Sequence, residues 1–108
     1  MAHTEQDVLD LLTDHSSEES WLNRQLGAQL AAQQKLPQLE RVLGGLLKDR
    51  VDWVRYHAFQ ALVRIDAPPE RLIPVAKGLK NDQFFRVRQA ASAYLDEVVQ
   101  DVRNHSPR

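Results

Sequence analysis

The chain has 108 residues, which is enough for one domain with a modest hydrophobic core. Apolar residues make up 43% and charged residues 27%, which excludes disorder, and the absence of cysteine excludes disulfides, thiolate metal sites and thiol catalysis. The net charge of −1 combines −4 over residues 1–35, +4 over residues 36–95 and −1 over the remaining residues 96–108, so no part is charged strongly enough to demand a polyanion partner.

The first predicted unit covers residues 4–34. Apolar positions predict one helix over residues 4–13 and a second over residues 17–33. Gly27 lies inside the second helix, where glycine costs about 1 kcal/mol relative to alanine. We therefore expect another helix to approach closely at Gly27.

The second predicted unit covers residues 36–66, with helices over residues 37–48 and 52–65. Gly44 and Gly45 lie inside the first of these helices. A phosphate-binding loop would need a preceding strand and a different glycine spacing. The pair therefore predicts tight packing or a bend.

The third predicted unit covers residues 68–103, with helices over residues 69–80 and 83–102 and a frayed tail at 104–108. Pro74 lies inside the first helix and should kink it. The last helix has no following unit to cover its apolar residues, which makes self-association an open alternative. These residues are Leu95, Val98, Val99 and Val102.

The units repeat at a fixed spacing. The segment 53–65 recurs 33 residues later at 86–98, so that Arg55 matches Arg88. An earlier, weaker copy places Trp21 32 residues before Trp53 and puts Asn23 where the other units have arginine. No strand pattern competes with the helices.

This repeat resembles the HEAT repeat and the HEAT-like repeats of the bilin-lyase group. The resemblance rests on the leucines and aspartate before each second helix and on the Val-Arg-x-x-Ala pattern within it: Leu46, Leu47, Asp49, Val54, Arg55, Ala58, and Leu79, Asp82, Val87, Arg88, Ala91. It implies an all-α fold, a short right-handed α-solenoid of three helix–turn–helix units in a single domain over residues 1–108. It also implies that the aspartates and arginines form a structural ladder between neighbouring units.

No residue set indicates catalysis. The four histidines show none of the i, i+3 or i+4 pairing that helical metal sites use, and no nucleophile–base set is visible. Glu18 and Glu19 fit the start of a helix, where negative charge is favoured. We therefore expect a non-enzyme with no cofactor and no metal. The N-terminus lacks the features of a signal peptide and no apolar run is long enough to span a membrane, so a cytoplasmic protein without a membrane partner is expected.

The exposed face of the second helices is the candidate binding surface. The resemblance places these helices on the concave side of a solenoid, and Trp, Tyr and Arg are the usual hot-spot residues of protein interfaces. An acidic peptide, loop or helix of another protein is the expected partner. The opposing interpretation is that the tryptophans pack between units as core. The candidate residues are Trp21, Arg24, Trp53, Tyr56, His57, Gln60, Arg86 and Gln89.

Two further functions remain open. The basic residues of the second and third units could bind nucleic acid, although they are spread over helices and loops rather than along one groove. By analogy with the bilin-lyase group, the chain could also be an accessory subunit of a lyase or maturation enzyme. The basic residues are Arg41, Lys48, Arg50, Arg64, Arg71, Lys77, Lys80 and Arg86.

Overall fold

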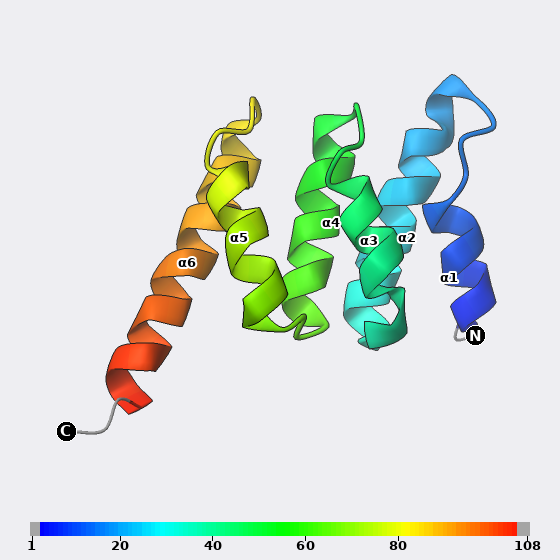
Figure 1. Cartoon of the computed structure of the whole chain (residues 1–108). Helices are drawn as coiled ribbons and strands as arrows, with labels where there is room; N and C mark the ends of the chain where they lie inside the picture. The colour runs from blue at the N-terminus through cyan, green and yellow to red at the C-terminus, as the bar shows by residue number, and fades with distance from the viewer. Residues whose placement is uncertain (1–2, 106–108) are drawn as a thin grey trace. The chain divides into compact units, whose positions relative to one another are not determined.

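The computed structural model describes residues 3–105 and is all-helical there, as predicted (Figure 1). Short 3-10 turns lead into two of the helices, at Glu18–Ser20 and Pro37–Leu39. The helices are α1 (Glu5–Leu12), α2 (Trp21–Gln34), α3 (Glu40–Leu46), α4 (Asp52–Arg64), α5 (Pro69–Leu79) and α6 (Phe85–His105). Each predicted helix is present, with ends that differ by a few residues.

The chain forms two compact units, Met1–Ala67 and Pro68–Arg108. The boundary follows Asp66, which ends α4 in a left-handed conformation (φ 60°), and precedes the consecutive prolines at positions 68 and 69. Proline lacks the N–H that a helix needs and disfavours helical backbone at the residue before it. The break between units that the sequence predicts is therefore present here. The prediction of a single domain over the whole chain stays a prediction.

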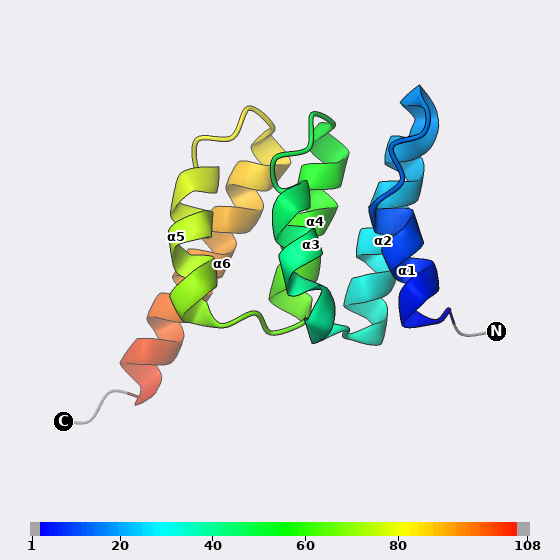
Figure 2. The same ribbon diagram turned by 45° about the vertical axis from the view of Figure 1, so that its right-hand side comes forward.

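The first unit contains two antiparallel helix pairs, α1 with α2 and α3 with α4. Helices α2 and α4 lie side by side and run in the same direction (Figures 1 and 2). The core between the four helices is apolar, since Leu12, Leu43 and Val54 are fully buried. The opposite surfaces of α2 and α4 are left uncovered by α1 and α3.

Local sequence decides where α1 begins. Thr4 Oγ1 accepts a hydrogen bond from Asp7 N at 3.1 Å, and Asp7 Oδ2 accepts one from Thr4 N at 3.0 Å. This capping box satisfies amides that would otherwise lack partners at the helix start. The same two hydrogen bonds lower the pKa of Asp7.

The three glycines of the first unit differ in their surroundings. A Cβ on Gly27 would lie 3.0 Å from Leu12 Cγ and 3.0 Å from Leu12 N, so the expected close approach of α1 to α2 is confirmed. A Cβ added at Gly44 or Gly45 would have no neighbouring atom within 4 Å. The prediction of tight packing there is wrong, because α3 turns this side outward.

The second unit consists of α5 and α6, which bury Leu72, Ala76, Val87 and Ala91. Helix α6 has 21 residues and α5 has 11, so the C-terminal half of α6 continues beyond α5 (Figures 1 and 2). Pro74 lies inside α5, as predicted. Of the expected frayed tail, Asn104 and His105 are helical and the remaining residues, 106–108, lie outside the described part of the chain.

Candidate functional site

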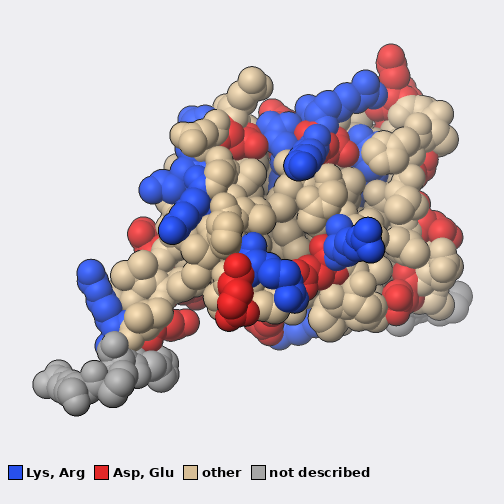
Figure 3. Space-filling view, viewed as in Figure 1, with Lys and Arg blue, Asp and Glu red and all other residues tan. Residues whose placement is uncertain are grey.

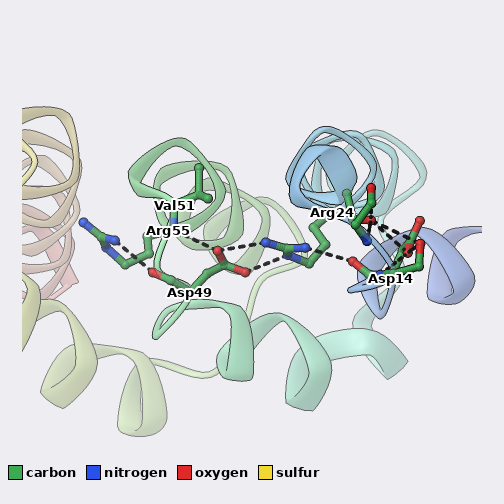
Figure 4. A network of polar contacts seen from close by, with 8 residues as sticks. Asp14, Arg24, Asp49, Val51 and Arg55 are labelled. Atoms are coloured by element: carbon green, nitrogen blue, oxygen red, sulfur yellow. Dashed lines mark hydrogen bonds and ion pairs between the residues drawn. The ribbon is translucent and has the colours of Figure 1, made fainter.

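A buried charged network joins the two helix pairs of the first unit (Figure 4). Arg24 on α2 donates from Nε to Asp49 Oδ2 at 2.7 Å and from Nη2 to Asp49 Oδ1 at 3.2 Å. Its Nη1 donates to the main-chain oxygen of Asp14 at 2.8 Å. Both charged side chains of this pair are less than 5% exposed. Such a bidentate pair fixes geometry on both sides of the guanidinium.

The structure removes Arg24 from the predicted binding surface. Its side chain is buried and fully used by Asp49 and Asp14, so it cannot orient an acidic partner. The sequence prediction placed Arg24 beside the tryptophans because it matched Trp21 to Trp53. The observed hydrogen bonds show that this match is displaced by one residue.

Equivalent arginines reveal the correct register. Arg55 Nη1 donates to the main-chain oxygen of Asp49, and Arg88 Nη1 donates to that of Asp82, each at 2.8 Å. Arg24 makes the same bond to Asp14. Arg24 is therefore the counterpart of Arg55 and lies 31 residues before it. Residue Asn23, which the sequence comparison placed in this role, instead donates to Asp14 Oδ2 at 2.8 Å.

Asp14 closes the network at the N-terminal end. Its Oδ1 accepts hydrogen bonds from Ser16 N at 3.0 Å, Ser16 Oγ at 2.7 Å and Ser20 Oγ at 3.1 Å. These hydrogen bonds, led by the Ser16 amide, hold the pKa of Asp14 well below its usual range. The loop before α2 is thus stabilised by its own polar side chains.

With this register, α2 and α4 present two matching stripes on their uncovered side. On α2, an i, i+4, i+7, i+11 series places four exposed side chains along one face of the helix. On α4, the residues 31 positions later repeat the series. We call the two stripes, together with Tyr56, the α2–α4 face: Leu22, Leu26, Gln29 and Gln33 from α2, and Trp53, His57, Gln60 and Arg64 from α4.

The N-terminal end of the α2–α4 face is apolar. Leu22 is 52% exposed, Leu26 is 44% exposed and Trp53 is 38% exposed, all unusually high for large apolar side chains in one small area. The sequence analysis did not identify Leu22 and Leu26. The interpretation that Trp53 is wholly core is excluded by its exposure.

Three aromatic rings form a cluster on α4. Trp53 and Tyr56 meet edge to face with ring centroids 5.9 Å apart, and Trp53 stacks near His57 at 6.2 Å. Tyr56 and His57 are 5.1 Å apart. Because each ring limits the rotamers of the others, the cluster offers a rigid contact area at a low cost in side-chain entropy.

The C-terminal end of the α2–α4 face is a polar groove of about 310 Å³ between the two helices. On the α4 wall of this groove, Gln60 Nε2 donates a hydrogen bond to the Tyr56 hydroxyl oxygen at 3.0 Å. Glutamine amides can donate to and accept from a peptide backbone, and Arg64 adds a positive charge. The groove is lined by Ala28, Gln29, Ala32, Gln33, Tyr56, His57, Gln60 and Arg64.

His57 lies at the junction of the apolar and polar ends. Its partial burial lowers its pKa, because desolvation disfavours the charged imidazolium. At neutral pH the ring is therefore uncharged and serves as part of the aromatic cluster rather than as a cation.

Of the remaining candidates, Trp21 is the half-buried first residue of α2 and does not occupy the position equivalent to Trp53. Leu22 occupies that position. Arg86 and Gln89 are exposed on α6 in the second unit, and the Arg86 guanidinium carbon lies 5.2 Å from the Phe85 ring centroid. That Trp21, Arg86 and Gln89 bind a partner stays a prediction.

A second cavity in the first unit, of about 620 Å³, lies beside the loops that precede α2 and α4. His15, Lys48 and Arg50 contribute to its wall, and Arg24 and Asp49 line it as well. Arg24 and Asp49 neutralise each other, which leaves the charges of Lys48 and Arg50 unbalanced and gives the wall of this cavity a net positive charge.

The face of the first unit shown in Figure 3 carries no single tract of basic residues. On the face shown in Figure 3, Lys and Arg side chains over the first unit are interspersed with Asp and Glu. Among residues 3–105, no group of His, Asp or Glu is arranged to hold a metal ion. None of the described helices combines the length and hydropathy that a membrane span requires.

Comparison with known families identifies the repeat. The model of the HEAT repeats family matches residues 5–96, which include all of α1 to α5 and more than half of α6. No curated protein and no solved structure matches the chain.

Proposed function

The chain belongs to the HEAT-repeat family, whose members commonly serve as protein-interaction scaffolds, and from this premise we propose that it is a non-catalytic adaptor that binds another protein through the α2–α4 face. Family membership also implies a helical solenoid. The observation that supports the proposal is the juxtaposition of three exposed large apolar side chains with a polar groove: Leu22, Leu26 and Trp53 lie at one end, and the glutamines of both helices at the other.

The two ends suit different parts of one ligand. Large apolar side chains of a partner segment would be buried against Leu26 and Trp53, which supplies most of the affinity. The backbone of the same segment would exchange hydrogen bonds with Gln29 and Gln60. Arg64, exposed at the far end of the groove, would select a carboxylate at that end of the segment.

The test is affinity capture from source lysate with mass-spectrometric identification. Wild type is compared with Leu26→Ser/Trp53→Ala, and circular dichroism checks that the helices remain. Val102→Ser is the matched control, because Val102 is a 61% exposed apolar residue on α6 in the other unit. The proposal expects a partner that wild type and the control retain and the double variant loses. Retention by the folded double variant would refute it.

Nucleic-acid binding remains the second candidate, supported by the charge of +4 over residues 36–95. It predicts an affinity that falls steeply with salt, since each phosphate contact releases counterions. Titration of a fluorescent oligonucleotide at low and at moderate salt separates it from the adaptor function, which is expected to depend weakly on salt.

A further inference from the structure

Helix α6 has an uncovered face that the α2–α4 face does not include. Phe85 is 47% exposed and Val99 is 48% exposed, although both are large apolar residues. They belong to the second unit, where α5 covers only part of the length of α6. An apolar helix surface of this kind marks a contact site when its pattern fits a partner.

The residues between Phe85 and Val99 form a stripe. Positions 85, 88, 92, 96 and 99 follow intervals of 3, 4, 4 and 3, which keep side chains on one face of a helix. An open groove of about 560 Å³ follows the first part of this stripe and another of about 310 Å³ follows the last part. We call Phe85, Arg88, Ser92, Asp96 and Val99 the α6 stripe.

The α6 stripe is symmetric about Ser92. If a second α6 lay antiparallel across it on a two-fold axis at Ser92, each Phe85 would face Val99 of the other copy and each Arg88 would face Asp96. The small Ser92 side chains would meet at the centre and permit close approach. Apolar residues thus meet apolar residues and each cation meets an anion, which is the self-complementarity that an isologous interface requires.

The charged groups of the α6 stripe are available for such a contact. Arg88 donates only from Nη1, to the main-chain oxygens of Asp82 at 2.8 Å and Gln83 at 3.0 Å. Its Nε and Nη2, and the carboxylate of Asp96, have no hydrogen-bond or ion-pair partner among residues 3–105. In the first unit, the same Nε and Nη2 atoms of Arg24 are those that hold Asp49.

We infer that a second copy of this chain docks on the α6 stripe, forming an antiparallel two-fold dimer in which Arg88 of each copy pairs with Asp96 of the other. One helix from each copy makes an interface at the small end of the range for specific complexes. We therefore expect a weak dimer, with a dissociation constant of roughly micromolar or higher.

Sedimentation velocity of the full chain over a wide concentration range tests the dimer. Wild type is expected to shift from monomer to dimer as concentration rises. Asp96→Lys places like charges opposite each other at two places and should weaken association at least about tenfold. Glu97→Lys is the matched control: it makes the same change in net charge at an exposed α6 position outside the α6 stripe and should leave association unchanged.

A charge exchange makes the test specific. Arg88→Glu/Asp96→Arg reverses both charges in every copy, so the cross-copy pairs form again and dimerisation should recover relative to Asp96→Lys. Circular dichroism checks that the double variant is folded, because Arg88 also bonds to its own loop. Loss of association in the folded double variant would overturn the specific pairing.

Cross-linking tests the antiparallel alignment, and the absence of native cysteine makes it clean. Phe85→Cys and Val99→Cys proteins are mixed in equal amounts under mild oxidation, and the mixed disulfide dimer is expected in more than the twofold excess over either homodimer that random pairing gives. A mixed dimer at or below that twofold ratio would overturn the alignment. A wild type that sediments as a monomer up to millimolar concentration would overturn the dimer itself.

Discussion

Each of the two compact units has an arginine at an equivalent structural position, but the two arginines make different contacts. Arg24 and Arg88 each donate from Nη1 to the loop that precedes their own helix. In the first unit the following repeat brings Asp49 against the rest of the guanidinium, and Arg24 is buried. In the second unit Arg88 remains exposed. In both units the Nη1 bond holds the loop that precedes the arginine's own helix, and in the first unit the other half of the Arg24 guanidinium also joins one repeat to the next.

The largest expected effect comes from breaking the buried pair. Asp49→Ala leaves Arg24 charged, buried and without its counter-ion, which should destabilise the first unit by about 3–5 kcal/mol. Urea unfolding followed by tryptophan fluorescence measures this unit alone, because Trp21 and Trp53 both lie in it. Asp10→Ala, at an exposed acidic residue of α1 in the same unit, is the control. Equal midpoints for the two variants would mean that the pair contributes little.

The packing that places α2, and therefore Arg24, depends on a glycine. Gly27→Ala puts a methyl group 3.0 Å from two atoms of Leu12 and should destabilise the first unit by about 1–3 kcal/mol. Gly44→Ala adds the same methyl group in open space within a helix and should stabilise it by up to about 1 kcal/mol. Thermal unfolding of both variants distinguishes them, and a shift of the same sign would contradict the assigned close approach.

Arg88→Met removes the arginine that has no buried partner. Because this side chain is exposed and loses only its hydrogen bonds to its own loop, the change should lower the free energy of unfolding by about 0.5–1.5 kcal/mol. Arg24→Met, measured beside it by circular dichroism in urea, should cost several times more. Similar losses would show that the two arginines have equivalent roles after all.

The smallest expected effect is a pH dependence confined to the first unit. The pKa of His57 is lowered in the folded chain, so the unfolded chain binds more protons as the pH falls below about 6.5. Stability from this residue is therefore complete above that pH and declines toward more acidic pH. The position equivalent to His57 in the second unit is Ala90, which cannot titrate. Tryptophan fluorescence unfolding at neutral and at mildly acidic pH should show less decline in His57→Gln than in wild type.

The helices and the repeat of the second and third units could be predicted from the sequence. Segments 53–65 and 86–98 match without a gap because Asp49 and Asp82 each precede their arginine by six residues. In the first unit the corresponding separation, from Asp14 to Arg24, is ten residues. The extra residues form the serine-rich turn before α2. Because of them, the sequence of the first unit cannot be aligned with the second unit without a gap.

This gap explains what the sequence could not reveal about the candidate site. Matching Trp21 to Trp53 hid Leu22 and Leu26, which occupy the equivalent exposed positions, and put Arg24 on the surface. Matching arginine to arginine would have placed the leucines correctly. The exposure of Trp53 could not be predicted, because an aromatic residue at that spacing fits either a core or an interface.

Site-specific photo-cross-linking tests the α2–α4 face most directly. A benzoylphenylalanine is placed at Leu26 on this face or at Arg41, an exposed residue of α3, and each protein is irradiated in source lysate. The adaptor function predicts one discrete cross-linked partner from position 26 that is absent from position 41 and is lost when Trp53→Ala is added. Identical products from both positions, or none from position 26 while wild type still captures a partner, would contradict it.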